Sequence, residues 1–205
     1  MGFAAAALLV GCTAGGGGSP TDTPTAGQSA STGPSTTATR SASPSPTPTP
    51  TPTPVTLQQG QVWTAQQVYD FNPNFSADPN YAVQSGSVAA SIVKLKGVSF
   101  GWVNETSGDK IEIAVAHPAA STQSQQSGQL AADQSACGDE QTAAAHYCQV
   151  IVDGAPAGTV SYFNASVGTL QIFTTTGYWV AVDSKIFLGP GDSYQIGADV
   201  VGNLK

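Results

Sequence analysis

Residues 13–56 are dominated by threonine, serine, proline and glycine, and this composition decides how much of the chain can fold. Such a stretch buries too little apolar surface to offset the conformational entropy that ordering would cost. From Pro44 to Pro54, proline alternates with serine or threonine. Each proline fixes its own φ and disfavours the helical region for the residue before it. We therefore expect a disordered, semi-rigid linker over residues 13–56 and a single folded domain over residues 57–205.

The N-terminal segment is short and apolar. The run from Phe3 to Val10 is far below the roughly 20 residues that a membrane-spanning helix needs, which excludes an integral span. Residues 1–12 are instead typical of the end of a secretory signal peptide. They lack the lysine or arginine that begins such a signal, so we expect its true start to lie upstream of Met1.

Four residues of this segment resemble the lipobox of bacterial lipoproteins: Leu9, Val10, Gly11 and Cys12. In that family a signal peptidase cuts before the cysteine, and the cysteine sulfur carries a diacylglycerol. The resemblance implies lipidation at Cys12 and an anchor of two or three acyl chains, which holds a protein stably to a membrane. The alternative is an ordinary free or buried cysteine.

The charge of the domain and the lack of a phosphate-binding motif exclude two classes of function. The formal net charge is -7, and the domain from residue 57 onward carries it without any arginine, because the one arginine, Arg40, lies in the linker. An acidic surface of this kind cannot clamp phosphates, so nucleic acid is not expected as a partner. The glycine run Gly15–Gly18 lies in the linker with no lysine after it, which excludes a phosphate-binding loop and ATP hydrolysis.

The domain begins with helix signals and continues with a strand pattern. Thr64 and Gln67 have the spacing of a capping box, which predicts a helix from about residue 65 to residue 69 or a little beyond. Residues 72–80 are predicted to be loop. The apolar, β-branched residues Ile92, Val93 and Leu95 favour a strand.

Alternation then predicts an antiparallel hairpin over residues 98–103 and 110–115, with Ile111, Ile113 and Val115 on one face. Residues 119–132 favour a surface helix. Strands are expected over residues 160–163, 169–174 and 178–182. A final helix, capped by Asp192 or Ser193, places four apolar residues on one face: Ile196, Val200, Val201 and Leu204. The fold class is therefore α+β, an antiparallel sheet with helices packed on it.

Residues 102–108 and 162–168 share a pattern of aromatic, apolar, asparagine, any residue, serine or threonine, any residue and glycine. Each is expected to have a helical segment upstream. The pattern indicates either a duplicated helix-plus-hairpin unit or two hairpins with the same favourable turn.

The two cysteines of the domain, Cys137 and Cys148, are expected to form a disulfide in an exported protein. A zinc site is the alternative, because His146 lies two residues before Cys148, and Asp139 and Glu140 lie between the cysteines. Cysteines in an oxidising compartment seldom remain thiolates, so no metal and no cofactor are expected.

No catalytic motif has its required context. Gly97 to Gly101 matches a nucleophile elbow around Ser99, but the strand pattern runs on past it. Ser91 and Lys94 match the serine-lysine spacing of penicillin-binding enzymes, yet the segment is β-branched and the companion motifs are missing. Any triad would have to use His117 or His146. A carboxylate cluster lies on and beside the first hairpin turn: Glu105, Asp109 and Glu112. Paired carboxylates can act as acid and base, but a solvated turn explains this cluster as well.

Aromatic residues concentrate on the expected strands. Alternation places Tyr178 and Trp179 on opposite faces, so one of them is expected at the surface or in a groove. Filling of the core is the favoured interpretation of these side chains. The alternative is a binding platform formed by Trp102, Tyr178 or Trp179.

The lipobox, the threonine- and proline-rich linker and a small α+β domain together resemble cell-envelope lipoproteins of actinobacteria, the high-GC Gram-positive bacteria. The domain is also distantly similar to sensor-like extracytoplasmic modules of mycobacterial envelopes. The resemblance implies a lipid-anchored location on the outer face of the membrane, with O-linked sugars on the linker, and implies no particular activity.

The leading hypothesis is a binding or sensor domain for a cell-wall component, a small solute or another envelope protein. An envelope hydrolase and a purely structural surface protein are the alternatives.

Overall fold

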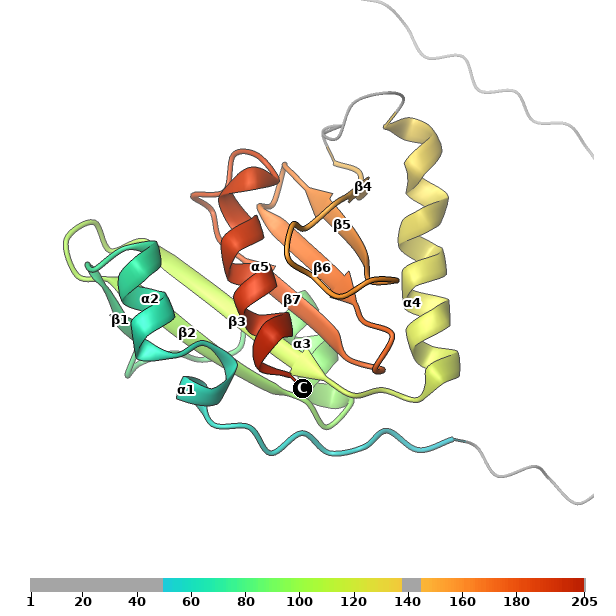
Figure 1. Ribbon diagram of the computed structural model, residues 1–205, viewed down its shortest axis with the longest axis horizontal. Coiled ribbons are helices and arrows are strands. Elements are labelled where there is room, and N and C mark those ends of the chain that lie inside the picture. The colour runs from blue at the N-terminus through green and yellow to red at the C-terminus, as the bar shows by residue number, and fades with distance from the viewer. Residues whose placement is uncertain (1–49, 138–144, 205) are drawn as a thin grey trace, which may run out of the picture. The chain divides into compact units, whose positions relative to one another are not determined.

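The computed structural model describes residues 50–137 and 145–204, so Leu9, Val10, Gly11, Cys12 and most of the linker lie outside the described residues. The domain is an antiparallel sheet of seven strands with helices on both of its faces (Figure 1). The strands are β1 (Phe75–Ala77), β2 (Val98–Asn104), β3 (Lys110–Ala116), β4 (Cys148–Val150), β5 (Val160–Asn164), β6 (Thr169–Phe173) and β7 (Trp179–Asp183), in the order β1-β2-β3-β7-β6-β5-β4. The helices are α1 (Gln59–Val62), α2 (Ala65–Phe71), α3 (Val88–Lys94), α4 (Ala120–Asp133) and α5 (Gly191–Asn203), and a 3-10 turn, η1, spans Gln134–Ala136. The predicted α+β class is confirmed.

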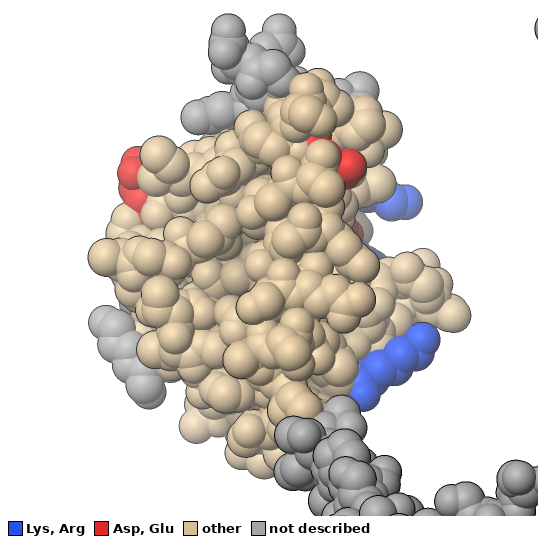
Figure 2. Space-filling model, turned by 90° about the vertical axis from the view of Figure 1, so that its right-hand side faces the viewer, with Lys and Arg blue, Asp and Glu red and all other residues tan. Residues whose placement is uncertain are grey.

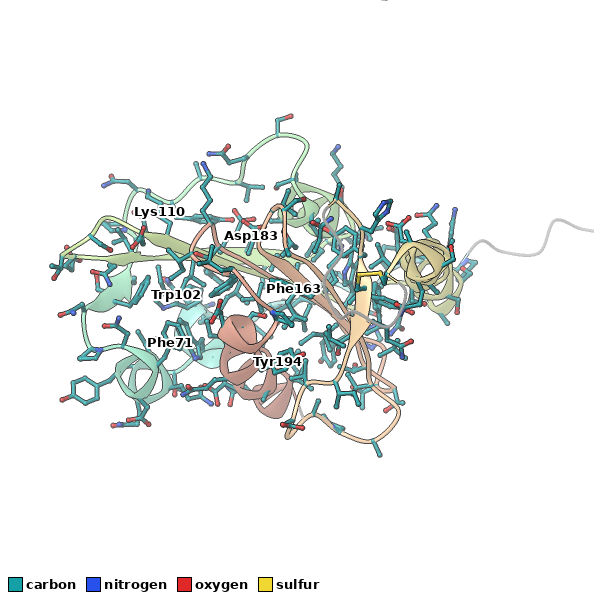
Figure 3. The ribbon with its side chains drawn as sticks, turned by 90° about the horizontal axis from the view of Figure 1, so that it is seen from above. Phe71, Trp102, Lys110, Phe163, Asp183 and Tyr194 are labelled. Carbon is teal, nitrogen blue, oxygen red and sulfur yellow. A yellow bond between two sulfur atoms is a disulfide. The ribbon has the colours of Figure 1, made fainter. Side chains whose placement is uncertain are left out.

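One face of the sheet carries the main hydrophobic core beneath α1, α2 and α5. The predicted alternation of β3 holds, because Ile111, Ile113 and Val115 are fully buried in this core. Figure 3 shows α5 on this side together with Trp102 and Phe163, while Lys110 and Asp183 lie on the opposite side of the sheet. Burial of this apolar surface is the main contribution to the stability of the domain.

The opposite face has a smaller core under α3. Ala89 and Ile92 of α3 pack against a floor that includes the small side chains Ala114 and Ala116 of β3. Beside them the floor becomes aromatic, with Tyr162, Phe173 and Trp179 buried on β5, β6 and β7. The α3 helix therefore covers only part of this face, and the end of the sheet near Glu112 and Asp183 is left for other elements.

The strand predicted around Ile92, Val93 and Leu95 is wrong, because these residues belong to α3 and its C-terminal cap. The side chain of Ser87 caps this helix by accepting a hydrogen bond from the backbone N–H of Ala90 at 3.0 Å. A β-branched residue costs a helix only about 0.5 kcal/mol, whereas full burial of an isoleucine contributes about 2 kcal/mol. Tertiary packing of Ile92 thus outweighs local preference.

The helices predicted at both ends of the domain are present, and only the start of the last helix differs from the prediction. Thr64 and Gln67 form the predicted capping box, with bonds of 3.2 Å and 2.9 Å between side chain and backbone. The last helix buries Ile196, Val200 and Val201 as expected, but it begins at Gly191 after Pro190. Asp192 is therefore inside the helix, and its carboxylate accepts hydrogen bonds from the backbone N–H groups of Leu188 and Gly189.

The pattern shared by residues 102–108 and 162–168 corresponds to two hairpin turns of the same kind. In both hairpins an asparagine carbonyl accepts a hydrogen bond from the glycine four residues later, Gly108 on Asn104 and Gly168 on Asn164. Both glycines have positive φ, 77° and 68°. Upstream the two segments differ, because α3 leads directly into β2 whereas β4 and a loop precede β5.

The predicted surface helix is α4, and none of its residues is buried. Figure 2 shows few charged side chains on the side of the molecule that carries α4. None of the helices in the described ranges combines the length and the apolar character that crossing a membrane requires.

Candidate functional site

A cavity of about 600 Å³ opens on the α3 side of the sheet, at the end where Glu112 and Asp183 lie. Its walls come from residues 78–87, from β2 and β3, and from the turn that follows β7. Although only 9% of the chain is charged, six charged residues line this cavity: Asp78, Asp109, Lys110, Glu112, Asp183 and Lys185. A cavity of this volume fits a small organic molecule.

Asp78 shapes one wall of the cavity. Its carboxylate accepts hydrogen bonds from the backbone N–H of Asn80 at 2.9 Å and from Lys110 Nζ at 2.7 Å, and its own N–H donates to the carbonyl of Gly101. These two bonds hold the pKa of Asp78 below its usual value, and the bond from Lys110 has the larger effect. The Asp78 side chain is only 4% exposed. It therefore fixes the turn that delivers Tyr81.

Tyr81 lies directly over Gly101 of β2. A Cβ atom at Gly101 would come within 2.7 Å of Tyr81 Cγ, so only glycine leaves room for the ring. The Tyr81 hydroxyl donates to Glu112 Oε2 at 2.8 Å and is also hydrogen-bonded to the Ser99 hydroxyl. Burial raises the pKa of Tyr81, so this phenol remains a hydrogen-bond donor at physiological pH.

Glu112 and Asp183 are opposite each other on the neighbouring strands β3 and β7. Opposed residues have Cβ atoms about 5 Å apart, and like charges in that arrangement repel. Burial is the main cause that raises the pKa of both carboxyl groups, and the charge of Asp183 raises that of Glu112 further. Hydrogen bonds from hydroxyl groups lower these pKa values: Tyr81 donates to Glu112, and Thr169 donates to Asp183.

The polar row continues beyond the cavity along the same face of the sheet. Tyr147 lies at the end of this row: burial raises the pKa of its hydroxyl, and the nearby side chains of Gln171 and Thr169 lower it. Gln171 in turn accepts a hydrogen bond from Trp179 Nε1 at 3.1 Å. The row therefore connects the cavity with the segment that precedes Cys148, and it gives the buried polar atoms of this face partners.

Replacing Glu112 with glutamine is expected to stabilise the domain at neutral pH by about 1 kcal/mol, after allowance for solvent screening. Because the folded-state pKa values of Glu112 and Asp183 are raised, the folded protein binds protons more tightly than the unfolded chain, and stability falls as the pH rises through these values. Glutamine keeps the acceptor for Tyr81 and removes the like charge. Urea denaturation at pH 3.5 and pH 7.5 should show the gain only at the higher pH.

The exposed Asp153→Asn variant is the control for this measurement. Two results would contradict the repulsion between Glu112 and Asp183: an equal change in the free energy of unfolding for both variants, or a gain for Glu112→Gln that is the same at both pH values.

The aromatic residues named from the sequence lie mostly inside the domain. Trp102 and Trp179 are each 3% exposed, in the cores on the two faces of the sheet, as expected for filling of the core. Trp102 also lines the cavity. Tyr178 is partly buried and packs against the main core, so Tyr178 and Trp179 do lie on opposite faces, and neither is fully exposed.

Cys137 and Cys148 form the predicted disulfide, with a Cα–Cα distance of 5.7 Å. The sulfurs are therefore not available as thiolate ligands for zinc, and Asp139 and Glu140 lie outside the described residues. Within residues 50–137 and 145–204, no group of three or more histidine, cysteine, aspartate or glutamate side chains is arranged to hold a metal ion.

The histidines do not join a serine and an acid in the described part of the chain. His117 Nε2 donates to the carbonyl of Thr176 at 3.1 Å, and its ring packs edge-on against Tyr178. His146 Nδ1 lies 3.9 Å from Asp133 Oδ1, beyond hydrogen-bonding distance. Neither arrangement activates a nucleophile.

The serine motifs are explained by the fold. Ser99 lies within β2 under Tyr81, so the sharp turn of a nucleophile elbow is missing at this position. Ser91 and Lys94 do share the helix α3, but both side chains are exposed and lie outside the cavity lining.

The carboxylate cluster predicted at the first hairpin turn separates into two roles. Glu105 bonds to Ser76, and Asp109 accepts from Ser107 at 2.6 Å, which are contacts of a solvated turn. Asp109 also lines the cavity, whereas Glu112 lines the cavity and is bonded to Tyr81 instead of to a residue of the turn. Sequence reasoning did not identify Asp78, Tyr81 or Asp183, because these residues approach Glu112 only through the pairing of distant segments.

Comparison with protein-family models, with curated proteins and with solved structures finds no match for this chain.

Proposed function

We propose that this chain is a lipid-anchored binding domain of the cell envelope, and that its ligand is a small polar solute held in the cavity that Tyr81 lines. The observation that carries the proposal is the cavity itself, about 600 Å³ in volume and lined by six charged residues. Binding sites for small molecules are concave, and a few converging polar groups fix the orientation of the ligand.

The proposed location rests on Leu9, Val10, Gly11 and Cys12, which resemble a lipobox, and on the linker that follows them. The disulfide between Cys137 and Cys148 supports an extracytoplasmic place, since such bonds persist in oxidising compartments. An anchored binding domain on a long linker would reach solutes or wall fragments near the outer face of the membrane. A small polar fragment of a cell-wall component would fit this ligand class.

Native mass spectrometry of the full-length protein, extracted gently from its own membranes, tests this function. The wild-type protein is expected to carry an additional non-covalent small-molecule mass. Ala82→Trp places an indole at the rim of the cavity, where Ala82 is exposed, and should abolish that mass. Ala157→Trp makes the same change on an exposed loop outside the cavity lining and should keep it.

Retention of the ligand mass by Ala82→Trp would place binding elsewhere. A wild-type protein without any bound mass would direct the search to protein partners instead of small solutes.

A further inference from the structure

Glu112 and Asp183 both line the cavity, and neither forms an ion pair with another of the described residues. Among the described residues, Lys110 forms an ion pair with Asp78, while the His146 ring lies 3.9 Å from the Asp133 carboxylate, outside the cavity lining. Lys110 is therefore committed to the wall of the cavity. Lys185, on the turn after β7, is exposed and acts on Asp183 through its charge without forming an ion pair.

Hydroxyl groups occupy only part of the hydrogen-bonding capacity of this pair. Tyr81 donates one bond to Glu112, and Thr169 donates one bond to Asp183. A carboxylate offers about four acceptor positions, so several remain on each side chain. Since Glu112 and Asp183 both line the cavity, a molecule inside it can reach these positions.

The surrounding residues restrict the chemistry of that molecule. An anionic group beside Glu112 and Asp183 would add a third like charge. A divalent metal ion would need more ligands of the usual kind than the described residues gather at one place. A primary ammonium group has three donors and one positive charge, and it can bond to both carboxylates at once.

We propose that the cavity selects a small organic cation and that a primary ammonium group of the ligand is held between Glu112 and Asp183. This inference rests on the proposed function and specifies its ligand class. The ammonium separates the two like charges, and the hydrogen bond from Tyr81 keeps Glu112 in place. Because Tyr81 requires Gly101 beneath it, the position of the carboxylate is fixed before the ligand arrives.

Isothermal titration calorimetry of the full-length protein in detergent micelles, at pH 7.5 and low ionic strength, tests the inference with matched probes. One set is glucosamine, glucose and glucuronate. The other is 1,6-diaminohexane, 1,6-hexanediol and hexanedioate. In at least one set, the amine is expected to bind at least about tenfold more tightly than its neutral counterpart, and the anion should not bind measurably.

The double variant Glu112→Gln, Asp183→Asn should lose this preference for the amine, whereas the exposed Asp153→Asn variant should keep it. Far-UV circular dichroism and thermal unfolding of the double variant verify that its fold is intact, and Asp183→Asn alone is the second variant if the double variant does not fold. Amines that bind no more tightly than their neutral counterparts, or that do not bind, overturn the inference.

The outcomes separate the inference from the function on which it rests. If the neutral probes bind as well as the amines, or if Ala82→Trp alone removes a co-purified mass while no amine binds, the cavity is a binding site for another ligand class. If the wild-type protein carries no mass and binds no probe, both proposals fail.

Discussion

Replacing Gly168 with alanine is expected to lower the free energy of unfolding by about 3 kcal/mol. Gly168 has a φ of 68°, which costs an alanine about 1 kcal/mol. A Cβ atom there would also overlap the carbonyl oxygen of Ser184 and lie 3.3 Å from that of Phe187. The β5–β6 turn and the loop after β7 would have to move apart, which breaks the hydrogen bond from Ser184 N–H to the Gly168 carbonyl.

Gly108 provides a matched control, because it has the same place in the equivalent turn and a φ of 77°. A Cβ atom at Gly108 meets nothing within 4 Å, so Gly108→Ala should cost only about 1 kcal/mol. Urea denaturation, followed by the fluorescence of the buried tryptophans, measures both variants. Equal losses would show that the contact with Ser184 contributes nothing.

Replacing Cys137 and Cys148 together with alanine is expected to lower the free energy of unfolding by about 3 kcal/mol. The disulfide closes a loop over a sequence separation of 11 residues, which restricts the unfolded chain. It also joins the end of η1 to β4, an edge strand of only three residues. Without it, β4 and the adjacent Tyr147 would separate more easily from β5 and β6.

Chemical denaturation of the wild-type protein with and without a reducing agent provides the control. Reduction should lower the stability of the wild-type protein by about as much as the double substitution, and it should leave the double variant unchanged. A wild-type protein whose stability does not respond to reduction would contradict this role of the disulfide.

The sequence alone predicts those parts of the fold that depend on local signals. The capping box at Thr64 and Gln67 and the alternation in β3 can be read within a few residues, and both are confirmed. The short edge strands β1 and β4 were missed, because three residues carry too little pattern to be recognised. Ile92 was assigned to a strand because its burial against β3, which decides for a helix, is a tertiary contact.

The candidate site could be predicted only in part for the same reason. The sequence predicts Glu112 in a carboxylate cluster with Glu105 and Asp109, which are close to it along the chain. Its neighbours in the fold are Tyr81, 31 residues earlier, and Asp183 on the adjacent strand. Such contacts follow from strand order, which local patterns do not specify.

The central claim is that the cavity lined by Tyr81, Glu112 and Asp183 binds the ligand, and chemical-shift mapping tests it most directly. Amide resonances of the full-length, isotope-labelled protein would be recorded during titration with whichever amine calorimetry shows to bind most tightly. The account predicts that the shifts concentrate in three segments that contribute lining residues to the cavity: 78–87, 110–112 and 183–186. Shifts confined to other surfaces, such as α4 or the turn at Val167, would contradict it.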